Sequence, residues 1–188
     1  MSEIRDTLRV VCDELAQCTG RIDAGAVGAA VEELARAPRV FLAGAGRSGL
    51  AVRGFAMRLM HMGMAAHLVG EVTTPSIGKG DLLVIGSGSG RTSSLLAMAR
   101  KAKELEARVL LATIDPRSPI AELADVVVAI PAPSPKATAG SGVLASIQPM
   151  GSLFEQSLFI LYDAMIVLLM RRSGITAEAM FARHANLE

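Results

Sequence analysis

The chain has little of several residue types that mark common classes of function. It has no Trp, one Tyr and five Phe among 188 residues, so it lacks the aromatic platforms on which single-stranded nucleic acids stack. Its formal net charge is +1, which leaves no basic footprint for a nucleic-acid partner. Because 51% of the residues are hydrophobic, the composition also argues against disorder.

Cysteine and long apolar runs are scarce too. Cys12 and Cys18 are the only cysteines, and their spacing on a predicted helix puts them on different faces, unsuited to pairing or metal binding. Free thiols and the lack of an N-terminal hydrophobic leader predict a cytoplasmic protein. The longest apolar run, residues 158–170, is interrupted by Tyr162 and Asp163 and is too short to span a bilayer. We therefore expect no membrane contact and a helix buried in the core or between subunits.

Apolar periodicity predicts two leading helices and then alternating strands and helices. The expected helices cover residues 2–18, 23–37 (capped by Asp23), 50–62, 95–107, 120–123, a long apolar stretch opened by 148–152, and 176–181. The expected strands cover residues 40–43, 66–69, 82–85, 109–114 and 126–130. Continuous apolar strands alternating with helices are typical of a parallel sheet covered on both faces. We predict an α/β, three-layer αβα sandwich with a five-stranded parallel sheet, Rossmann-like, with helical N- and C-terminal extensions. Residues 131–146 lack periodicity and are predicted to be a surface connection or a lid.

The strand at 82–85 runs directly into glycines that alternate with serines. A strand-to-helix turn aims N–H groups and the positive end of a helix dipole at one point, and glycine lets the backbone approach a ligand. Three hydroxyls and one arginine near that point suggest a small monophosphate, and no P-loop motif is present. The alternative is a turn whose hydroxyls only cap the next helix. The predicted substrate-binding residues of this loop are Ser87, Gly88, Ser89, Gly90, Arg91 and Thr92.

A second glycine-rich loop follows the strand at 40–43. Gly44-x-Gly46-x-x-Gly49 matches the dinucleotide fingerprint, and Glu71 stands where a ribose-binding acid could lie. Against that reading, the chain has no second domain for a hydride acceptor, and the loop at 86–92 would be redundant. Ligands of such sheets bind outside the carboxyl ends of the strands, so both loops can line one crevice. The residues assigned to substrate binding in this loop are Gly46, Arg47 and Ser48.

Titratable side chains supply the candidates for chemistry. Glu155 lies in the first turn of the long apolar helix, where it is either a general base at the crevice or an ordinary capping charge. His184 lies in a polar tail, where a lone histidine is normally solvated. The positions of His61 and His67 favour structural roles over catalytic ones. His61 is also a candidate substrate-binding residue. The His, Cys and acidic residues show no metal-ligand spacing, so neither a metal nor a cofactor is expected.

Five segments together resemble a known family. They are Gly44-Ala-Gly-Arg-Ser-Gly49, Arg58-Leu-Met-His-Met-Gly63, Ser87-Gly-Ser-Gly-Arg-Thr92, Gln148-Pro-Met-Gly-Ser-Leu-Phe-Glu-Gln156 and Arg183-His-Ala-Asn-Leu-Glu188. These segments resemble the 6-phospho-3-hexuloisomerases of the sugar isomerase (SIS) domain superfamily. The resemblance implies one SIS domain over residues 1–188, with a core at about 30–173 and a tail at 174–188 that reaches a neighbouring subunit of a tetramer. It also implies a set of roles: phosphate ligands Ser48, Ser87, Ser89 and Thr92, enolising base Glu155, and second catalytic group His184.

The implied reaction converts hex-3-ulose 6-phosphate, made by formaldehyde fixation in the ribulose monophosphate pathway, into fructose 6-phosphate. Moving the carbonyl from C3 to C2 through a 2,3-enediol needs one carboxylate for both carbon transfers and a second group for the oxygen-bound proton. A ketone at C3 cannot close a five-membered ring through O6, so the substrate is expected to be open-chain. His184 is then an oxygen-to-oxygen proton carrier, or a ring opener in the reverse direction.

Two other readings remain open. One is a non-catalytic SIS module that senses a sugar phosphate, although such modules usually carry a DNA-binding domain and residues 1–39 are too few and too apolar for one. The other is an isomerase of phospho-arabinose or phospho-sedoheptulose.

Overall fold

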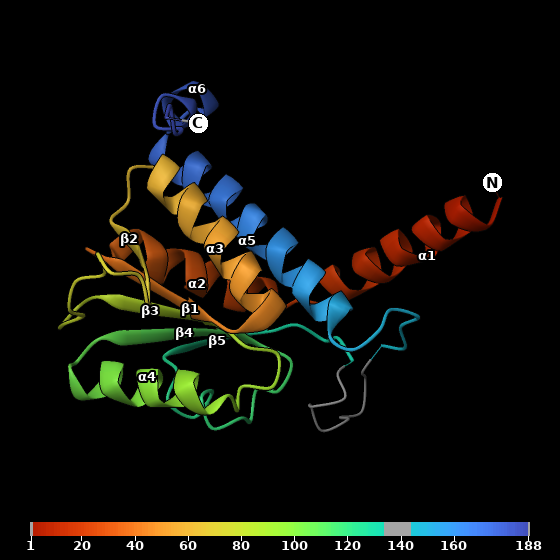
Figure 1. The fold of residues 1–188 in the computed structure, drawn as a ribbon, viewed down its shortest axis with the longest axis horizontal. Coiled ribbons are helices and arrows are strands. Elements are labelled where there is room, and N and C mark those ends of the chain that lie inside the picture. Colours follow the sequence, from red (N-terminus) through yellow and green to blue (C-terminus); the bar gives the residue numbers. More distant parts are fainter. Residues whose placement is uncertain (1, 134–143, 188) are drawn as a thin grey trace.

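A computed structural model of the protein describes residues 2–133 and 144–187. Its helices and strands form three layers, with α2, α3 and α5 on one face of the sheet and α4 on the other (Figure 1). The elements are α1 (Ser2–Thr19), α2 (Ala24–Arg36), β1 (Val40–Gly44), α3 (Gly46–His61), β2 (Ala66–Leu68), β3 (Leu82–Gly86), α4 (Ser93–Glu104), β4 (Arg108–Thr113), β5 (Val126–Ala129), α5 (Ser152–Ser173) and α6 (Ala177–Phe181). The sheet has the order β2-β1-β3-β4-β5, and every pair is parallel. The predicted five-stranded parallel sandwich is confirmed.

The strands alternate their side chains between two hydrophobic cores. Leu42 pairs in register with Val84 and packs toward α2, α3 and α5, while Phe41 pairs with Leu83 and packs toward α4. This period of two is what an extended chain imposes. Because both faces are covered, the central strands β1 and β3 are apolar throughout, which is why they were recognisable in the sequence. The edge strand β2 contains His67, and β4 begins with the exposed Arg108.

Local capping agrees with the sequence. The carboxylate of Asp23 accepts a hydrogen bond from the amide of Ala26 at 2.6 Å and so caps α2 as expected. Thr176 caps α6 through the amide of Ala179 at 3.2 Å. Gly174, with φ +71°, ends α5 in a left-handed conformation.

The segment 120–123 differs from its predicted helix. It forms turns, with one bond from the amide of Leu123 to the carbonyl of Ile120 at 3.2 Å. The amide of Ile120 donates instead to the carbonyl of Gly90 at 3.2 Å. Its apolar side chains are buried in the core beneath α4, so their pattern reflected burial of a tight turn rather than helical periodicity.

Helix α5 runs through the centre of the helical layer and packs against α1, α2 and α3 (Figure 1). It has 22 residues and a mean hydropathy of 1.7 in its most apolar window, so its length and composition would suffice to cross a membrane. The expectation from the run 158–170 therefore understated the helix. Half of that window is buried within the fold, and Tyr162 stacks on Phe55 of α3 with ring centroids 4.3 Å apart. This packing is that of a core helix.

The predicted connection or lid at 131–146 falls largely on residues 134–143, which lie outside the described residues.

Candidate active site at the carboxyl edge of the sheet

The two glycine-rich loops lie side by side at one edge of the sheet. Gly44 at the end of β1 pairs in register with Gly86 at the end of β3. Helix α3 starts two residues after β1, and α4 starts at Ser93 after the loop that follows β3. The amide-rich N-termini of both helices therefore face the same edge, as anion sites require.

Close packing explains the glycines of the first loop. A Cβ on Gly49 would lie 2.8 Å from the carbonyl oxygen of Gly44, and a Cβ on Gly86 would lie 2.8 Å from Val52 Cγ2. Helix α3 can sit this close to the sheet only without those side chains, which also lets it begin at Gly46 rather than at the predicted Leu50. The fingerprint spacing thus has a packing explanation. Glu71, the proposed ribose ligand of the dinucleotide alternative, forms an ion pair with Arg53 at 3.4 Å.

The second loop is braced from behind by the segment that follows β4. The carbonyl of Gly88 accepts hydrogen bonds from the Ile114 amide at 3.0 Å and from Thr113 Oγ1 at 3.1 Å. Gly90 has φ +58°, and a Cβ there would lie 1.9 Å from Oγ of the fully buried Ser118. These contacts fix the shape of the loop.

The hydroxyls of this loop do not serve as helix caps in the way that the alternative reading requires. Thr92 is the N-cap residue of α4, yet its side chain makes no capping hydrogen bond. Ser89 Oγ accepts one bond from the amide of Arg91 at 3.3 Å. Ser87 is held by its backbone, which donates to the carbonyl of Ala112 at 3.0 Å. The Thr92 hydroxyl thus stands at the start of α4 without capping it, the arrangement expected of a phosphate ligand.

Asp115 orients the arginine of the loop. Its carboxylate accepts a hydrogen bond from Arg91 Nη2 at 2.9 Å and another from the backbone amide of Arg117 at 3.0 Å. The Arg117 amide, together with the Arg91 guanidinium, outweighs the effect of burial and lowers the pKa of Asp115 below its usual value. The carboxylate is therefore charged at neutral pH and holds Arg91 beside the loop.

Two predicted site residues from distant parts of the chain meet at the same edge. Arg47 in the first turn of α3 donates from Nε to the carboxylate of Glu155 in the first turn of α5. The Glu155 side chain is 19% exposed and that of Arg47 62% exposed, so the carboxylate is partly sheltered while the guanidinium reaches outward. The pair joins the start of α5 to the first loop and places a candidate base at the carboxyl edge of the sheet.

The histidines lie elsewhere. His61, in the last turn of α3, stacks with His184 at a centroid distance of 5.3 Å. Helix α3 spans about 24 Å, so this cluster is at the opposite end of the helix from Arg47. Burial, with the charge of Arg58 and the nearby His184, lowers the pKa of His61. Within one chain, the structure therefore separates His61 and His184 from Glu155 and the phosphate-binding candidates.

Comparison with known proteins identifies the family to which this fold belongs. The SIS domain family matches residues 33–161. The chain belongs to the SIS family. Among curated SIS relatives, a 3-hexulose-6-phosphate isomerase of Bacillus subtilis is 54% identical over 150 residues, covering 80% of each chain. A protein of the same name from Mycobacterium gastri is 45% identical over 186 residues, covering 99% of this chain and 92% of the relative.

A solved SIS structure supports the assignment. A hypothetical protein from Methanococcus jannaschii, whose structure is described as inferring a molecular function of 3-hexulose-6-phosphate isomerase, has a TM-score of 0.80 and 32% identity. The match covers 97% of this chain and 99% of that one. A second crystal structure, of a hypothetical protein, has a TM-score of 0.87 and 34% identity over 100% of this chain and 98% of the other.

Sequence reasoning missed the residues that support this SIS site from behind. Thr113, Asp115 and Ser118 follow β4, and only their contacts with the loop at 86–92 reveal their roles. One signal was available: consecutive strands of such a sheet often pair, as β3 and β4 do here, so polar residues at the carboxyl end of β4 were candidates to lie beside that loop. Over residues 2–133 and 144–187, no three His, Cys, Asp or Glu side chains gather as metal ligands would.

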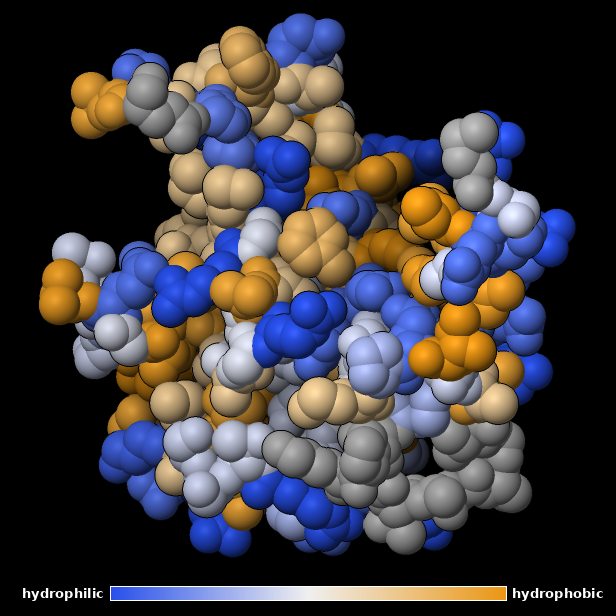
Figure 2. Space-filling model, turned by 45° about the vertical axis from the view of Figure 1, so that its right-hand side comes forward, coloured by the Kyte–Doolittle hydropathy of each residue, from blue (hydrophilic) through white to orange (hydrophobic). Residues whose placement is uncertain are grey.

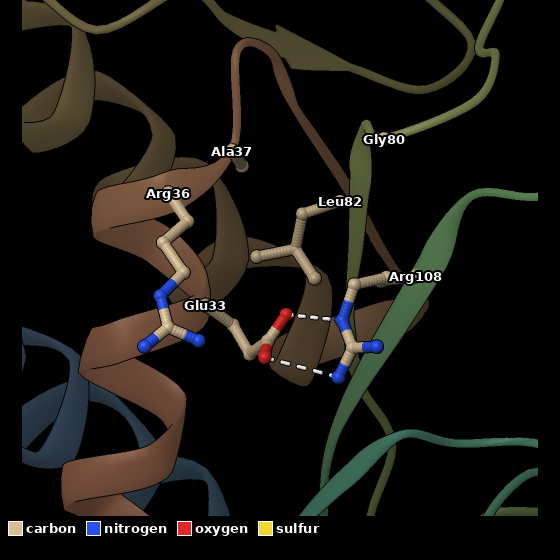
Figure 3. A pocket seen from close by; sticks show the side chains of 6 residues that line it. All are labelled: Glu33, Arg36, Ala37, Gly80, Leu82 and Arg108. Carbon is tan, nitrogen blue, oxygen red and sulfur yellow. Dashed lines mark hydrogen bonds and ion pairs between the residues drawn. The ribbon is translucent and has the colours of Figure 1, made fainter.

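One pocket of the described residues lies away from this edge. It measures about 260 Å³ and lies at the amino ends of β3 and β4 beside the end of α2 (Figure 3). Arg108 donates to both carboxylate oxygens of Glu33 there, and Arg36 pairs with Glu32 at 3.4 Å. Its charged groups thus satisfy one another, and none of the predicted site residues lines it.

Proposed function

We propose that this SIS protein interconverts D-arabino-hex-3-ulose 6-phosphate and D-fructose 6-phosphate through a 2,3-enediol. The observation that carries the proposal is the position of Glu155, a partly sheltered carboxylate at the same sheet edge as the hydroxyl-bearing loops. The relatives that are 45–54% identical over most of the chain carry the name of this isomerase. Together they favour an enzyme over a sensing module.

The proposed phosphate site uses the two helix starts. Ser48 from α3 joins the hydroxyls of Ser87, Ser89 and Thr92, and the backbone amide of Gly88 completes it. The amide of Gly90 instead donates to the carbonyl of Ser87 at 3.1 Å and holds the loop's shape. The uncapped side chain of Thr92 supports this role. Arg91, held by Asp115 at 2.9 Å, adds one positive charge, which suits a monophosphate dianion better than a longer phosphate chain.

The proposed chemistry is a proton transfer in two halves. The Glu155 carboxylate removes the proton from C2 in one direction or C3 in the other and returns it to the neighbouring carbon, so no net charge or atom is gained. Meanwhile a proton must pass from one substrate oxygen to the other. Arg47, paired with Glu155, is positioned to stabilise the negative charge that develops on the enediolate oxygens.

The second proton-transfer group is proposed to come from another subunit. His184 lies far from Glu155 of its own chain, docked with His61 at the end of α3. The side chain of Arg183 donates to the carbonyls of His61 at 3.2 Å and Ala179 at 3.1 Å, which anchors the tail. His61 and His184 would therefore act together on a substrate held by the neighbour's loops.

Exposed apolar side chains favour such an assembly. Ile4 and Leu8 on α1 are 68% and 60% exposed, and Leu50 on α3 and Phe159 on α5 are 65% and 45% exposed. Figure 2 shows hydrophobic surface gathered on the right of that view, where α1 projects from the body. Two separate apolar faces support a homo-oligomer with more than one kind of contact, and we propose a tetramer. Light scattering in solution measures this directly.

The division of the chain into a core at 30–173 and a tail at 174–188 remains a prediction, as does a cytoplasmic location. The two cysteines form no disulfide, with Cys12 exposed and Cys18 buried, which is compatible with a reducing compartment.

The deciding experiment supplies purified protein with hex-3-ulose 6-phosphate and follows the formation of fructose 6-phosphate. We expect turnover that persists after treatment with a chelator. Tight binding of fructose 6-phosphate without turnover would instead establish the sensing module. Turnover of phospho-arabinose or phospho-sedoheptulose, but not of the hexulose phosphate, would move the assignment to those isomerases.

A further inference from the structure

A single carboxylate on α1 fastens the segment that leads into α5. Glu14 accepts hydrogen bonds from Ser146 Oγ at 2.7 Å, from the amide of Ile147 at 2.7 Å and from Gln148 Nε2 at 2.9 Å. The amide of Gln148 also donates to Ser146 Oγ at 3.0 Å. Three consecutive residues are thus tied, through side chain and backbone, to one acidic group more than a hundred residues earlier in the chain.

This attachment lies a few residues before the proposed base. The amide of Ser152, the first residue of α5, donates to the carbonyl of Pro149 at 3.2 Å, and the amide of Glu155 donates to Gly151 at 3.0 Å. Met150 adopts φ +59°, which makes the turn a defined bend rather than a slack connection. A displacement of residues 146–148 would therefore be passed to the first turn of α5 and to the Glu155 side chain.

The chemistry of the attachment requires an anion. All three groups that reach Glu14 are donors, and charge-assisted bonds are shorter and stronger than neutral ones. Burial alone would raise the pKa of Glu14, but the bonds from Gln148, Ser146 and Ile147 outweigh it and lower that pKa. Elsewhere α1 is loosely embedded, since Cys18 is its only buried residue within the described part. The hydrogen bonds of Glu14 therefore attach α1 to residues 146–148 at a position where the helix has little buried surface.

We propose that Glu14 is a positioning residue that sets the first turn of α5 and, through it, the direction of the Glu155 carboxylate. The inference rests on the proposed function for its catalytic consequence. Glu14 lies on α1, which forms neither of the proposed phosphate loops, so its effect should fall on the chemical step and not on phosphate affinity.

The experiment compares Glu14→Ala and Glu14→Gln with wild type, using Asp13→Asn as the matched control. Asp13 is an exposed carboxylate one position earlier on the same helix. A misplacement of about 1 Å can cost up to about 100-fold in rate, so we expect Glu14→Ala to lower kcat by roughly 10-fold or more with little change in KM. Glu14→Gln keeps an acceptor for the Ile147 amide and should recover part of kcat, while Asp13→Asn should match wild type.

Amide hydrogen exchange supplies a second measurement that does not depend on turnover. Glu14→Ala should speed exchange at Ile147 and at Ser152 and Glu155 in the first turn of α5. Faster exchange at Ile147 with unchanged kcat and KM would mean that Glu14 only stabilises the local structure, and it would overturn the proposal. So would equal losses of kcat and phosphate affinity in all Glu14 variants.

Failure of the proposed function is distinguishable from failure of this inference. If the wild-type protein shows no turnover of the hexulose phosphate, the assigned reaction is wrong. Exchange at Ser152 and Glu155 then decides the positioning role by itself. Faster exchange in Glu14→Ala supports it, and rates equal to wild type overturn it.

Discussion

The two edges of the same sheet handle polar groups in opposite ways. At the amino edge, Arg108 donates to the carboxylate of Glu33 (Figure 3), so these two charges neutralise each other. At the carboxyl edge, Thr92 begins α4 without a side-chain capping bond, and Glu155 is paired with the guanidinium of Arg47. Ion pairs of the first kind hold layers together, whereas unfilled hydrogen-bonding capacity is what a ligand can use.

The largest effect should come from the carboxylate of the ligand-facing edge. Glu155→Gln keeps the size of the side chain but cannot accept a carbon-bound proton, so kcat should fall by about 10²–10⁴-fold with substrate affinity retained. The matched variant is Glu33→Gln at the other edge, which should weaken the tie to Arg108 and lower the unfolding temperature without changing kcat. Steady-state kinetics and thermal unfolding measure both. Undiminished exchange of the C2 hydrogen with solvent in Glu155→Gln would remove it as the base.

The next effect concerns the tail. His184→Ala should cost about 10-fold or more in kcat with little change in thermal unfolding, because Arg183 still anchors α6. Mixing Glu155→Gln subunits with His184→Ala subunits by reversible dissociation should restore activity above either parent, since some hybrid sites then hold both intact residues. Hybrids that form but stay inactive would show that His184 serves no neighbouring site.

The phosphate hydroxyls come third. Ser87→Ala, Ser89→Ala and Thr92→Ala each remove one donor to a charged group, which costs about 1.5–3 kcal/mol, or roughly 10–150-fold in affinity. Ser94→Ala, an exposed serine in the first turn of α4, is the control and should bind like wild type. Calorimetry with inorganic phosphate and with fructose 6-phosphate gives the values. Wild-type affinity in all three loop variants would make the carboxyl edge a structural turn.

The smallest effect separates backbone strain from crowding. Gly46 and Gly90 both have left-handed φ, +57° and +58°, but a Cβ on Gly46 meets nothing within 4 Å while one on Gly90 meets Ser118. Gly46→Ala should cost about 1–2 kcal/mol of unfolding free energy. Gly90→Ala should cost about 1–3 kcal/mol more, part of which Ser118→Gly should restore. Urea unfolding measures all four proteins, and equal costs for the two glycines would contradict the bracing seen here.

The sequence predicted the architecture because the central strands β1 and β3 are buried on both faces and therefore apolar, and because Gly44 and Gly86 mark their ends. It pointed to residues 86–92 as a candidate phosphate loop because hydroxyls and glycines there are contiguous. It did not reveal the Arg47–Glu155 pair, whose members are 108 residues apart, or the buried contact of Ser118 with Gly90. Both contacts depend on how distant elements pack together, and the periodicity of a single segment does not predict that packing. The turns at 120–123 were predicted as a helix for the same reason.

The length of α3 constrains any symmetric assembly that shares its sites. Gly46 and His61 mark opposite ends of a helix about 24 Å long. If His184 serves a neighbouring site as proposed, each subunit has a receiving end and a donating end separated by that span. In a two-fold pair both contacts form at once only when the α3 helices of the two subunits run antiparallel. Each tail then meets the partner's loops, and two sites are completed by one symmetry axis. A rotation that brought like ends together would complete neither.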